Sequence, residues 1–317
     1  MRRKVAIAGV VLIGLLVIAA AVLWVWKPWV PAIELLDPGE NGERVVEPGL
    51  FANYYAADGE AVGAILLLHG SVGGINSSTT HTALALQEAG FNVLVPSYFG
   101  APGQPHNLEL IPLETFDRAL SWLGSRPEVP RDRMAVMGSS KGAEAALLVA
   151  LRHPDLRAVV AGDPSSAVWP GINWSRPRAQ ASWIADGEPL LTLPYGPFHV
   201  SVLFGDLGRF YEGAVERLRE HSEAAIAIEQ IQAPVLLVCG EADRLWPSCP
   251  MSRQLEARAE EAGTPPVRVL AYERVGHGVL GPRVPDGHPS YRWLDRWGGT
   301  AAEANAARAD GWPIVLA

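Results

Sequence analysis

The most informative segment of the sequence is Met134-Ala-Val-Met-Gly-Ser-Ser-Lys-Gly-Ala-Glu-Ala-Ala-Leu-Leu-Val-Ala150. It begins with a short apolar run that predicts a buried strand, and from Ala143 to Leu151 its residues favour a helix. Between the two, Gly138-Ser-Ser-Lys-Gly142 has the pattern G-x-S-x-G, with Ser140 at its centre. A strand, a sharp turn and a helix in this order are the setting of a nucleophile elbow.

The glycines on either side of Ser140 have a physical reason to be there. A strained turn leaves little room for Cβ atoms where the strand and helix backbones converge. Because the helix would start at the serine, its free N–H groups and its dipole would favour an oxyanion at that point. A plain Gly/Ser turn is the alternative, since a chain with 32 glycines can match a short pattern by chance. The choice between a nucleophile elbow and a plain turn depends on whether an acid and then a histidine follow in the chain.

Length and composition restrict the class of protein. The 317 residues suffice for one large α/β domain or two smaller ones, and an apolar content of 49% with 19% charged residues describes a globular protein with an additional apolar segment. The net charge of −8 gives no reason to expect nucleic acid as a partner. Two cysteines form neither a disulfide framework nor a four-ligand metal site, and no metal or cofactor is expected.

The N-terminus combines a basic tip, Met1 to Lys4, with an apolar run from Val5 to Trp26. About twenty apolar residues can cross a bilayer as a helix, so residues 1–27 are predicted to be a single-pass membrane anchor. The basic tip then places the rest of the chain on the extracytoplasmic side. A signal peptide cleaved near Ala19-Ala20-Ala21, giving a secreted protein, is the alternative. Residues 28–42, with several prolines, are predicted to be a linker.

The folded domain is expected over residues 43–317. Hairpin-like pieces come first, at 43–63, and then strands and helices alternate, which predicts a mainly parallel sheet with helices on both faces. The strands are expected at 64–68, 92–96, 134–137, 156–161, 234–239 and 267–272, and the helices at 78–88, 113–123, 143–151, 252–262 and 300–310, the last ended by Gly311.

Between about 164 and 232 the alternation is lost. This interval is rich in aromatic residues and contains an amphipathic helical pattern near 213–228. A stretch of that length without strands and helices usually has a function of its own. We predict a cap insertion over the site, with packing in the core as the alternative role for each aromatic side chain.

Ser140, Asp243 and His277 each follow a predicted strand directly. In an open α/β sheet that edge is where ligands bind, and the chain order Ser, acid, His is that of α/β-hydrolases. The histidine would take the hydroxyl proton of the serine, and the aspartate would hold the imidazole and stabilise the imidazolium. Glu241 and Asp163 are the competing acids, both less well placed.

A glycine-rich loop, His69-Gly-Ser-Val-Gly-Gly74, follows the first central strand. Loops at this place supply oxyanion donors in α/β-hydrolases, so the backbone N–H groups of Ser71 and Val72, together with that of Lys141, are the candidates. A plain strand-to-helix turn is the alternative. The side chains of Lys141 and Glu144 either form a pair one helical turn apart or lie on a solvated helix face.

Three motifs together resemble the C-terminal catalytic domain shared by acyl-CoA thioester hydrolases and bile-acid-CoA:amino-acid N-acyltransferases, within the broader circle of dienelactone-hydrolase-like enzymes. They are Gly-Ser-Ser-Lys-Gly-Ala-Glu at 138–144, Gly-Glu-Ala-Asp-Arg-Leu-Trp-Pro-Ser at 240–248 and Gly-His-Gly at 276–278. The resemblance implies an α/β-hydrolase fold with Ser140 as nucleophile, Asp243 as acid and His277 as base. Because the N-acyltransferase members use a cysteine as nucleophile, the serine favours hydrolysis.

The expected function is therefore that of a serine hydrolase cleaving an acyl ester or acyl thioester through an acyl-enzyme intermediate. An acyltransferase to an amine or alcohol and a non-catalytic protein that binds an acyl ligand are the alternatives. The expected partners are a small-molecule acyl ester or thioester and, through the N-terminal helix, the membrane. Tyr98, Trp169 and Trp246 are the aromatic residues expected to contact the substrate.

Cys239 and Cys249 flank Asp243. We expect Cys239 at the end of a buried strand and Cys249 at the start of the next helix. A disulfide in an oxidising compartment would fix the loop that carries the acid. Two buried free cysteines acting as small apolar residues are the alternative.

Overall fold

The computed structural model describes residues 13–19, 21–23, 25, 30, 32–174, 178–197 and 199–317. The chain divides into two compact units, Met1–Ala32 and Ile33–Ala317. The membrane anchor predicted at 1–27 falls largely outside the described residues. Within the described part of the chain, no helix has both the length and the apolar character needed to cross a membrane.

The second unit is built on an eight-stranded sheet with the order β1-β2-β4-β3-β6-β7-β10-β11. Its strands are β1 Glu43–Glu47, β2 Leu50–Tyr55, β3 Gly63–Leu68, β4 Phe91–Ser97, β6 Met134–Ser139, β7 Ala158–Gly162, β10 Val235–Gly240 and β11 Val267–Tyr272. The hairpin β1–β2 lies at one edge and β2 runs antiparallel to β4, whereas the pairings from β4 to β11 are parallel. The predicted mainly parallel sheet with an edge hairpin is confirmed.

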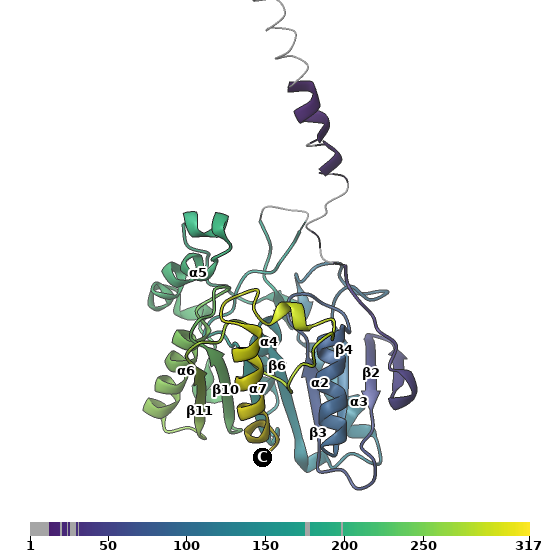
Figure 1. Cartoon of the computed structure of the whole chain (residues 1–317). Helices are drawn as coiled ribbons and strands as arrows, with labels where there is room; N and C mark the ends of the chain where they lie inside the picture. Colours follow the sequence, from purple (N-terminus) through teal and green to yellow (C-terminus); the bar gives the residue numbers. More distant parts are fainter. Residues whose placement is uncertain are drawn as a thin grey trace, which may run out of the picture. The chain divides into compact units, whose positions relative to one another are not determined.

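Helices cover both faces of the sheet, as the alternating pattern predicts. They are α2 Ser77–Glu88, α3 Glu114–Ser125, α4 Lys141–Arg152, α6 Ser248–Ala262 and α7 Ala301–Leu316. One apolar cluster joins the sheet to α3, α4 and α6, and a second joins the opposite face to α2 and α7, which lie in front of the sheet in Figure 1. All six residues of β3 are buried, as expected of a strand covered on both faces.

The last helix does not end where the sequence predicts. It passes Gly311 and includes Pro313, and it ends only at Leu316. Trp312 and Val315 pack against the apolar cluster on that face of the sheet, and this burial opposes the cost of a proline inside a helix. Gly311 serves packing here, because a Cβ at that position would come 2.8 Å from the hydroxyl of Tyr272.

The segment between β7 and β10 contains several short elements. They are β8 Trp183–Ala185 and β9 Glu188–Pro189, which form a small sheet with β5 Ile111–Pro112, then α5 Gly208–Val215 and the 3₁₀ helices Val200–Phe204, Leu218–Ala224 and Ile228–Gln230. The prediction of a single amphipathic helix at 213–228 is therefore wrong. Helical structure is interrupted at residues 225–227, where Ala225 forms a bridge with Ala167 and Ile226 donates a hydrogen bond to the carbonyl of Ser166, at 3.0 Å.

Candidate active site

Ser140 occupies the sharp turn between β6 and α4. Its backbone has φ 58° and ψ −124°, a conformation that costs free energy in any residue with a Cβ. The two flanking glycines are needed for close packing, since a Cβ on Gly138 would come 2.1 Å from the Gly142 carbonyl and a Cβ on Gly142 would come 2.4 Å from the His69 carbonyl. The strand, strained turn and helix predicted around this serine are all present.

The glycine-rich loop after β3 packs directly against this serine. A Cβ built on Gly70 would lie 3.4 Å from the Cβ of Ser140 and 3.9 Å from its Oγ. Ser71 and Val72 follow Gly70 directly, and the Val72 side chain is exposed. The three predicted oxyanion donors thus come from two segments, the loop and the first residue of α4, that meet at Ser140.

The Asp243 carboxylate, in the loop after β10, is held by four donors. Oδ2 accepts hydrogen bonds from Nδ1 of His277 at 2.8 Å and from Oγ of Ser248 at 2.7 Å. Oδ1 accepts from the backbone N–H groups of Leu245, at 2.9 Å, and Trp246, at 3.3 Å. The sequence reasoning missed the role of Ser248, although this serine closes the Asp-x-x-Trp-Pro-Ser motif.

His277, after β11, is oriented by Asp243 through Nδ1 and is only 10% exposed. Its Nε2 is buried and has no hydrogen-bond partner among the described residues, so it is not bonded to Ser140 in this structure. Active-site hydrogen bonds of this kind often form only when a substrate is bound. Burial lowers the pKa of His277, but the carboxylates of Asp243 and Asp163 outweigh this and raise it to about 9.

Lys141 and Glu144 form a buried ion pair beneath the elbow, and the solvated-face alternative is wrong. Nζ of Lys141 lies 2.8 Å from both carboxylate oxygens, and the two side chains are 4% and 0% exposed. Glu144 also accepts hydrogen bonds from Nε1 of Trp183, at 2.7 Å, and from the backbone N–H of Trp169, at 3.2 Å. Burial raises the pKa of Glu144 and lowers that of Lys141, and the ion pair opposes both shifts.

The three aromatic residues predicted to contact substrate are all almost fully buried. Tyr98 stacks on the His69 ring, with 3.8 Å between ring centroids, and donates its hydroxyl proton to the His69 carbonyl, so it supports the glycine-rich loop from beneath. Nε1 of Trp169 donates to Oγ of Ser165 at 2.7 Å. The Trp246 ring lies 5.9 Å from that of His277. Direct contact with a substrate would require these rings to be uncovered.

Cys239 and Cys249 form a disulfide, with their Cα atoms 5.2 Å apart, which settles the alternative that the sequence left open. Both residues are fully buried. The bond joins the end of β10 to the start of α6, as expected, and so closes the loop that carries Asp243.

Removing this bond is expected to destabilise the protein. Replacing both cysteines with alanine should lower the free energy of unfolding by about 2–3 kcal/mol, because the unfolded chain gains the entropy of an open loop. Urea unfolding of the variant and the native protein measures the difference. A midpoint that does not change when the native protein is reduced would contradict the expectation.

Comparison with known proteins gives the family. The family model described as BAAT / Acyl-CoA thioester hydrolase C terminal matches residues 111–317. The chain belongs to this family. Relatives in the mouse, Mus musculus, include acyl-coenzyme A thioesterase 6, 26% identical over 79% of this chain and 57% of the relative, and bile acid-CoA:amino acid N-acyltransferase, 25% identical over 92% and 65%. This member of the BAAT / acyl-CoA thioester hydrolase family thus spans less than two thirds of the length of these relatives.

Solved structures agree on the fold of this family member. A dienelactone hydrolase-like promiscuous phosphotriesterase from metagenomic libraries matches with a TM-score of 0.52 and 14% identity, over 87% of this chain and 95% of that one. Carboxyl esterase 2 from Tuber melanosporum matches with a TM-score of 0.52 and 16% identity, over 88% and 89%. The chain therefore has the α/β-hydrolase fold, as predicted.

Proposed function

We propose that this protein is a serine hydrolase that cleaves an acyl ester or acyl thioester through an acyl-enzyme intermediate. The observation that carries the proposal is the pairing of His277 with Asp243 at the sheet edge where Ser140 sits on its strained turn. Family membership supports an acyl substrate, because its relatives include enzymes named as acyl-CoA thioesterases and as acyl-CoA N-acyltransferases.

In the proposed reaction, Oγ of Ser140 attacks the acyl carbonyl carbon while Nε2 of His277 takes the hydroxyl proton. The negative charge that forms on the carbonyl oxygen is stabilised by backbone N–H groups of Lys141 and of Ser71 or Val72. The imidazolium then protonates the leaving alcohol or thiol as the bond to the acyl carbon breaks. His277 then takes a proton from a water molecule as the water attacks the acyl carbonyl carbon, and the imidazolium returns that proton to Oγ of Ser140 as the bond between Oγ and the acyl carbon breaks and the acid leaves.

We assign the segment from about 164 to 232 to a cap over this site. Its support is the packing of α5 on the loop 241–247, which carries Asp243 and is called the acid loop here. There the N–H groups of Leu207 and Gly208 donate to the carbonyl of Arg244 at 2.8 and 3.0 Å. Trp169 belongs to this segment, and movement of the cap would be the event that exposes it to an acyl chain. Tyr98 and Trp246 lie outside this segment. Tyr98 contacts the glycine-rich loop at His69, and Trp246 is part of the acid loop.

A fluorophosphonate probe tests the proposal directly. The native protein should be labelled with one equivalent, on Ser140, and the label should block hydrolysis of p-nitrophenyl esters and acyl-CoAs of graded chain length. Absence of both labelling and hydrolysis would favour a protein that only binds an acyl ligand.

Acyl transfer is the second candidate, favoured by the N-acyltransferases among the relatives. The same substrates are then supplied with amines or alcohols. Formation of an amide or a new ester in place of the free acid would identify the protein as an acyltransferase rather than a hydrolase. Formation of free acid alone would support the serine hydrolase.

We further propose that residues 1–27 attach the protein to a membrane and that the hydrolase unit lies on the extracytoplasmic side. The apolar run and its basic tip support the attachment, and the Cys239–Cys249 disulfide supports an oxidising compartment. Deletion of 1–27 should move the protein from the membrane fraction to the soluble fraction and leave its activity intact. A mature N-terminus near Val22 would instead identify a cleaved signal peptide and a secreted protein.

A further inference from the structure

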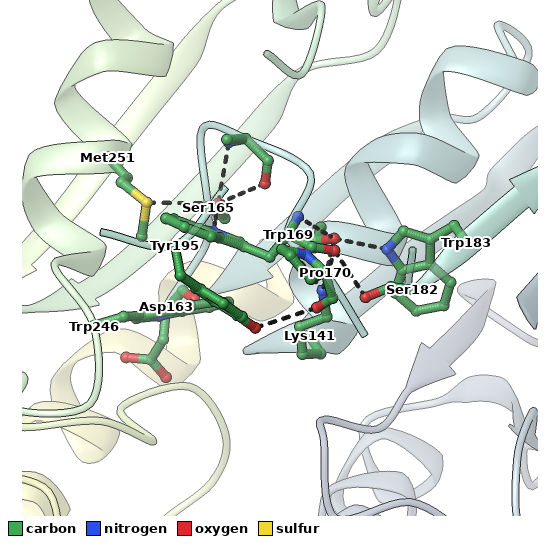
Figure 2. Close-up of polar contacts among 12 residues, drawn as sticks. Lys141, Asp163, Ser165, Trp169, Pro170, Ser182, Trp183, Tyr195, Trp246 and Met251 are labelled. Atoms are coloured by element: carbon green, nitrogen blue, oxygen red, sulfur yellow. Dashed lines mark hydrogen bonds and ion pairs between the residues drawn. The ribbon is translucent and has the colours of Figure 1, made fainter. Parts of the chain in front are cut away.

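Asp163 is a buried acid directly after β7 that the proposed reaction does not use. It is fully buried in the left-handed region, at φ 47°, where a non-glycine residue is strained. Oδ2 accepts a hydrogen bond from the backbone N–H of Gly278 at 2.8 Å, and the Asp163 carbonyl accepts from Nε1 of Trp246 at 3.1 Å. Figure 2 shows Asp163 beside Trp246 with its carboxylate pointing away from Trp169. Asp163 thus contacts both the acid loop and the histidine loop, the segment 273–278 that follows β11 and carries His277.

Arg308, on α7, binds the carbonyl group of Gly278, the residue whose N–H group is bound by Asp163. Its Nε and Nη2 donate to the Gly278 carbonyl at 3.1 and 2.6 Å, and Nη1 donates to the carbonyl of Pro282 at 3.0 Å. The arginine is 6% exposed. Gly278, next to His277, is therefore fixed between two buried charged side chains, with its N–H on a carboxylate and its carbonyl on a guanidinium.

The carboxylate is also close to the imidazole itself. A carboxylate oxygen of Asp163, a carboxylate oxygen of Asp243 and a ring nitrogen of His277 all lie within 4.8 Å of one another. Oδ1 of Asp163 is buried and has no hydrogen-bond partner within the described ranges. We propose that Asp163 is a second carboxylate, balanced by Arg308, that positions His277 and stabilises its protonated form. This inference rests on the proposed role of His277 as the general base.

Charge balance gives the physical reason. Among the described residues, the charged groups around the imidazole are Asp243 on the acid loop, Asp163 after β7 and, behind Asp163, Arg308 on α7. With a neutral imidazole this group carries a net charge of about −1, and with an imidazolium it carries none. In the active form of the protein the imidazole is neutral before the reaction and becomes an imidazolium when it takes the serine proton, so in that form the second carboxylate favours the transition state over the ground state.

The pKa values agree with this geometry. Burial raises the pKa of Asp163 to about 6, and the positive charges of His277 and Arg308 oppose that rise. Burial lowers the pKa of His277, but Asp243 and, to a smaller extent, Asp163 raise it above its ordinary value. A base must be neutral to accept a proton, so activity should rise with pH as His277 loses its proton.

The variant Asp163→Asn tests the inference, because it removes the charge and keeps an oxygen that can accept from Gly278. The low-pH limb of kcat/KM should move to lower pH by about one unit or more. The high-pH plateau should fall roughly tenfold, since one pKa unit of lost imidazolium stabilisation corresponds to a factor of ten. A residue that only held the loop in place would lower the rate at every pH without moving the limb.

Ser165→Ala is the matched control. Ser165 is buried two residues away and bonds to Trp169 and to the carbonyl of Ala167, and not to the histidine loop. Its loss should reduce stability and leave the limb in place. An unmoved limb in folded Asp163→Asn, or an equal shift in Ser165→Ala, would overturn the inference.

Nuclear magnetic resonance titration of His277 in Ser140→Ala gives a measurement that needs neither activity nor the Asp163 variant. A pKa near 9 is expected, and a value near the ordinary 6.5 would overturn the second carboxylate. The probe separates this result from the proposed function. If Ser140 is labelled but the low-pH limb of Asp163→Asn does not move, only the proposed role of Asp163 is wrong. If Ser140 is not labelled but the pKa of His277 is near 9, the proposed serine hydrolase is wrong and the pairing of His277 with the two carboxylates stands.

Discussion

Ser140→Ala is expected to abolish turnover and leave the fold intact. The loss in kcat should be on the order of 10⁴- to 10⁶-fold, because the proposed nucleophile is removed and His277 and Asp243 then have no hydroxyl to activate. Alanine, like serine, carries a Cβ, so the strain at φ 58° is almost unchanged. Initial rates on an ester that the native protein hydrolyses, together with thermal unfolding, measure the two quantities separately.

The neighbouring Ser139→Ala is the control. Ser139 is the last residue of β6, and its side chain belongs to the strand rather than to the apex of the turn. Its replacement should reduce the rate far less. Equal losses of activity in the two variants would show that the assignment of Ser140 to the apex of the elbow is wrong.

Glu144→Ala is expected to cause the largest loss of stability. It leaves the Lys141 ammonium buried without its anionic partner, and it leaves the N–H groups of Trp169 and the Trp183 indole without an acceptor. Breaking a buried ion pair from one side costs about 3–5 kcal/mol. Activity should fall as well, because α4 begins directly after Ser140, the proposed nucleophile, and would lose its attachment to the segment after β7.

Urea unfolding of three proteins tests this expectation. Glu144→Gln should cost less than Glu144→Ala, since it keeps an oxygen for the Trp183 indole. Glu303→Ala removes a carboxylate that pairs with Arg274, which is 80% exposed, and that accepts a hydrogen bond from the Thr300 hydroxyl, so it should lower the free energy of unfolding far less. A loss for Glu144→Ala no larger than that for Glu303→Ala would mean that the buried pair does not stabilise the fold.

The order of strands and helices could be predicted because local patterns determine it. Runs such as Ala64–Leu68 are apolar throughout, as a strand covered on both faces requires. The elbow could be predicted for the same reason, since two glycines flanking a serine between a strand and a helix form a local geometry. The contact between Asp243 and His277 followed from topology, because the carboxyl ends of parallel strands share one edge.

Contacts between distant segments produced what the patterns could not show. The helix after Ala301 continues past Gly311 because Trp312 and Val315 find apolar partners on the sheet. The helical pattern at 213–228 breaks because Ile226 bonds to a segment sixty residues away in the chain, at Ser166.

The sequence by itself determined the α/β layering, the strained turn at Ser140 and the meeting of an acid with a histidine, since each depends on periodicity, on glycine geometry or on strand order. Only the tertiary structure decided that Lys141 and Glu144 are buried, that Cys239 and Cys249 are bonded, and that Asp163 and Arg308 hold Gly278 from opposite sides. The energy of a charge depends on the groups and the solvent that surround it, and these are set by packing between elements far apart in the chain.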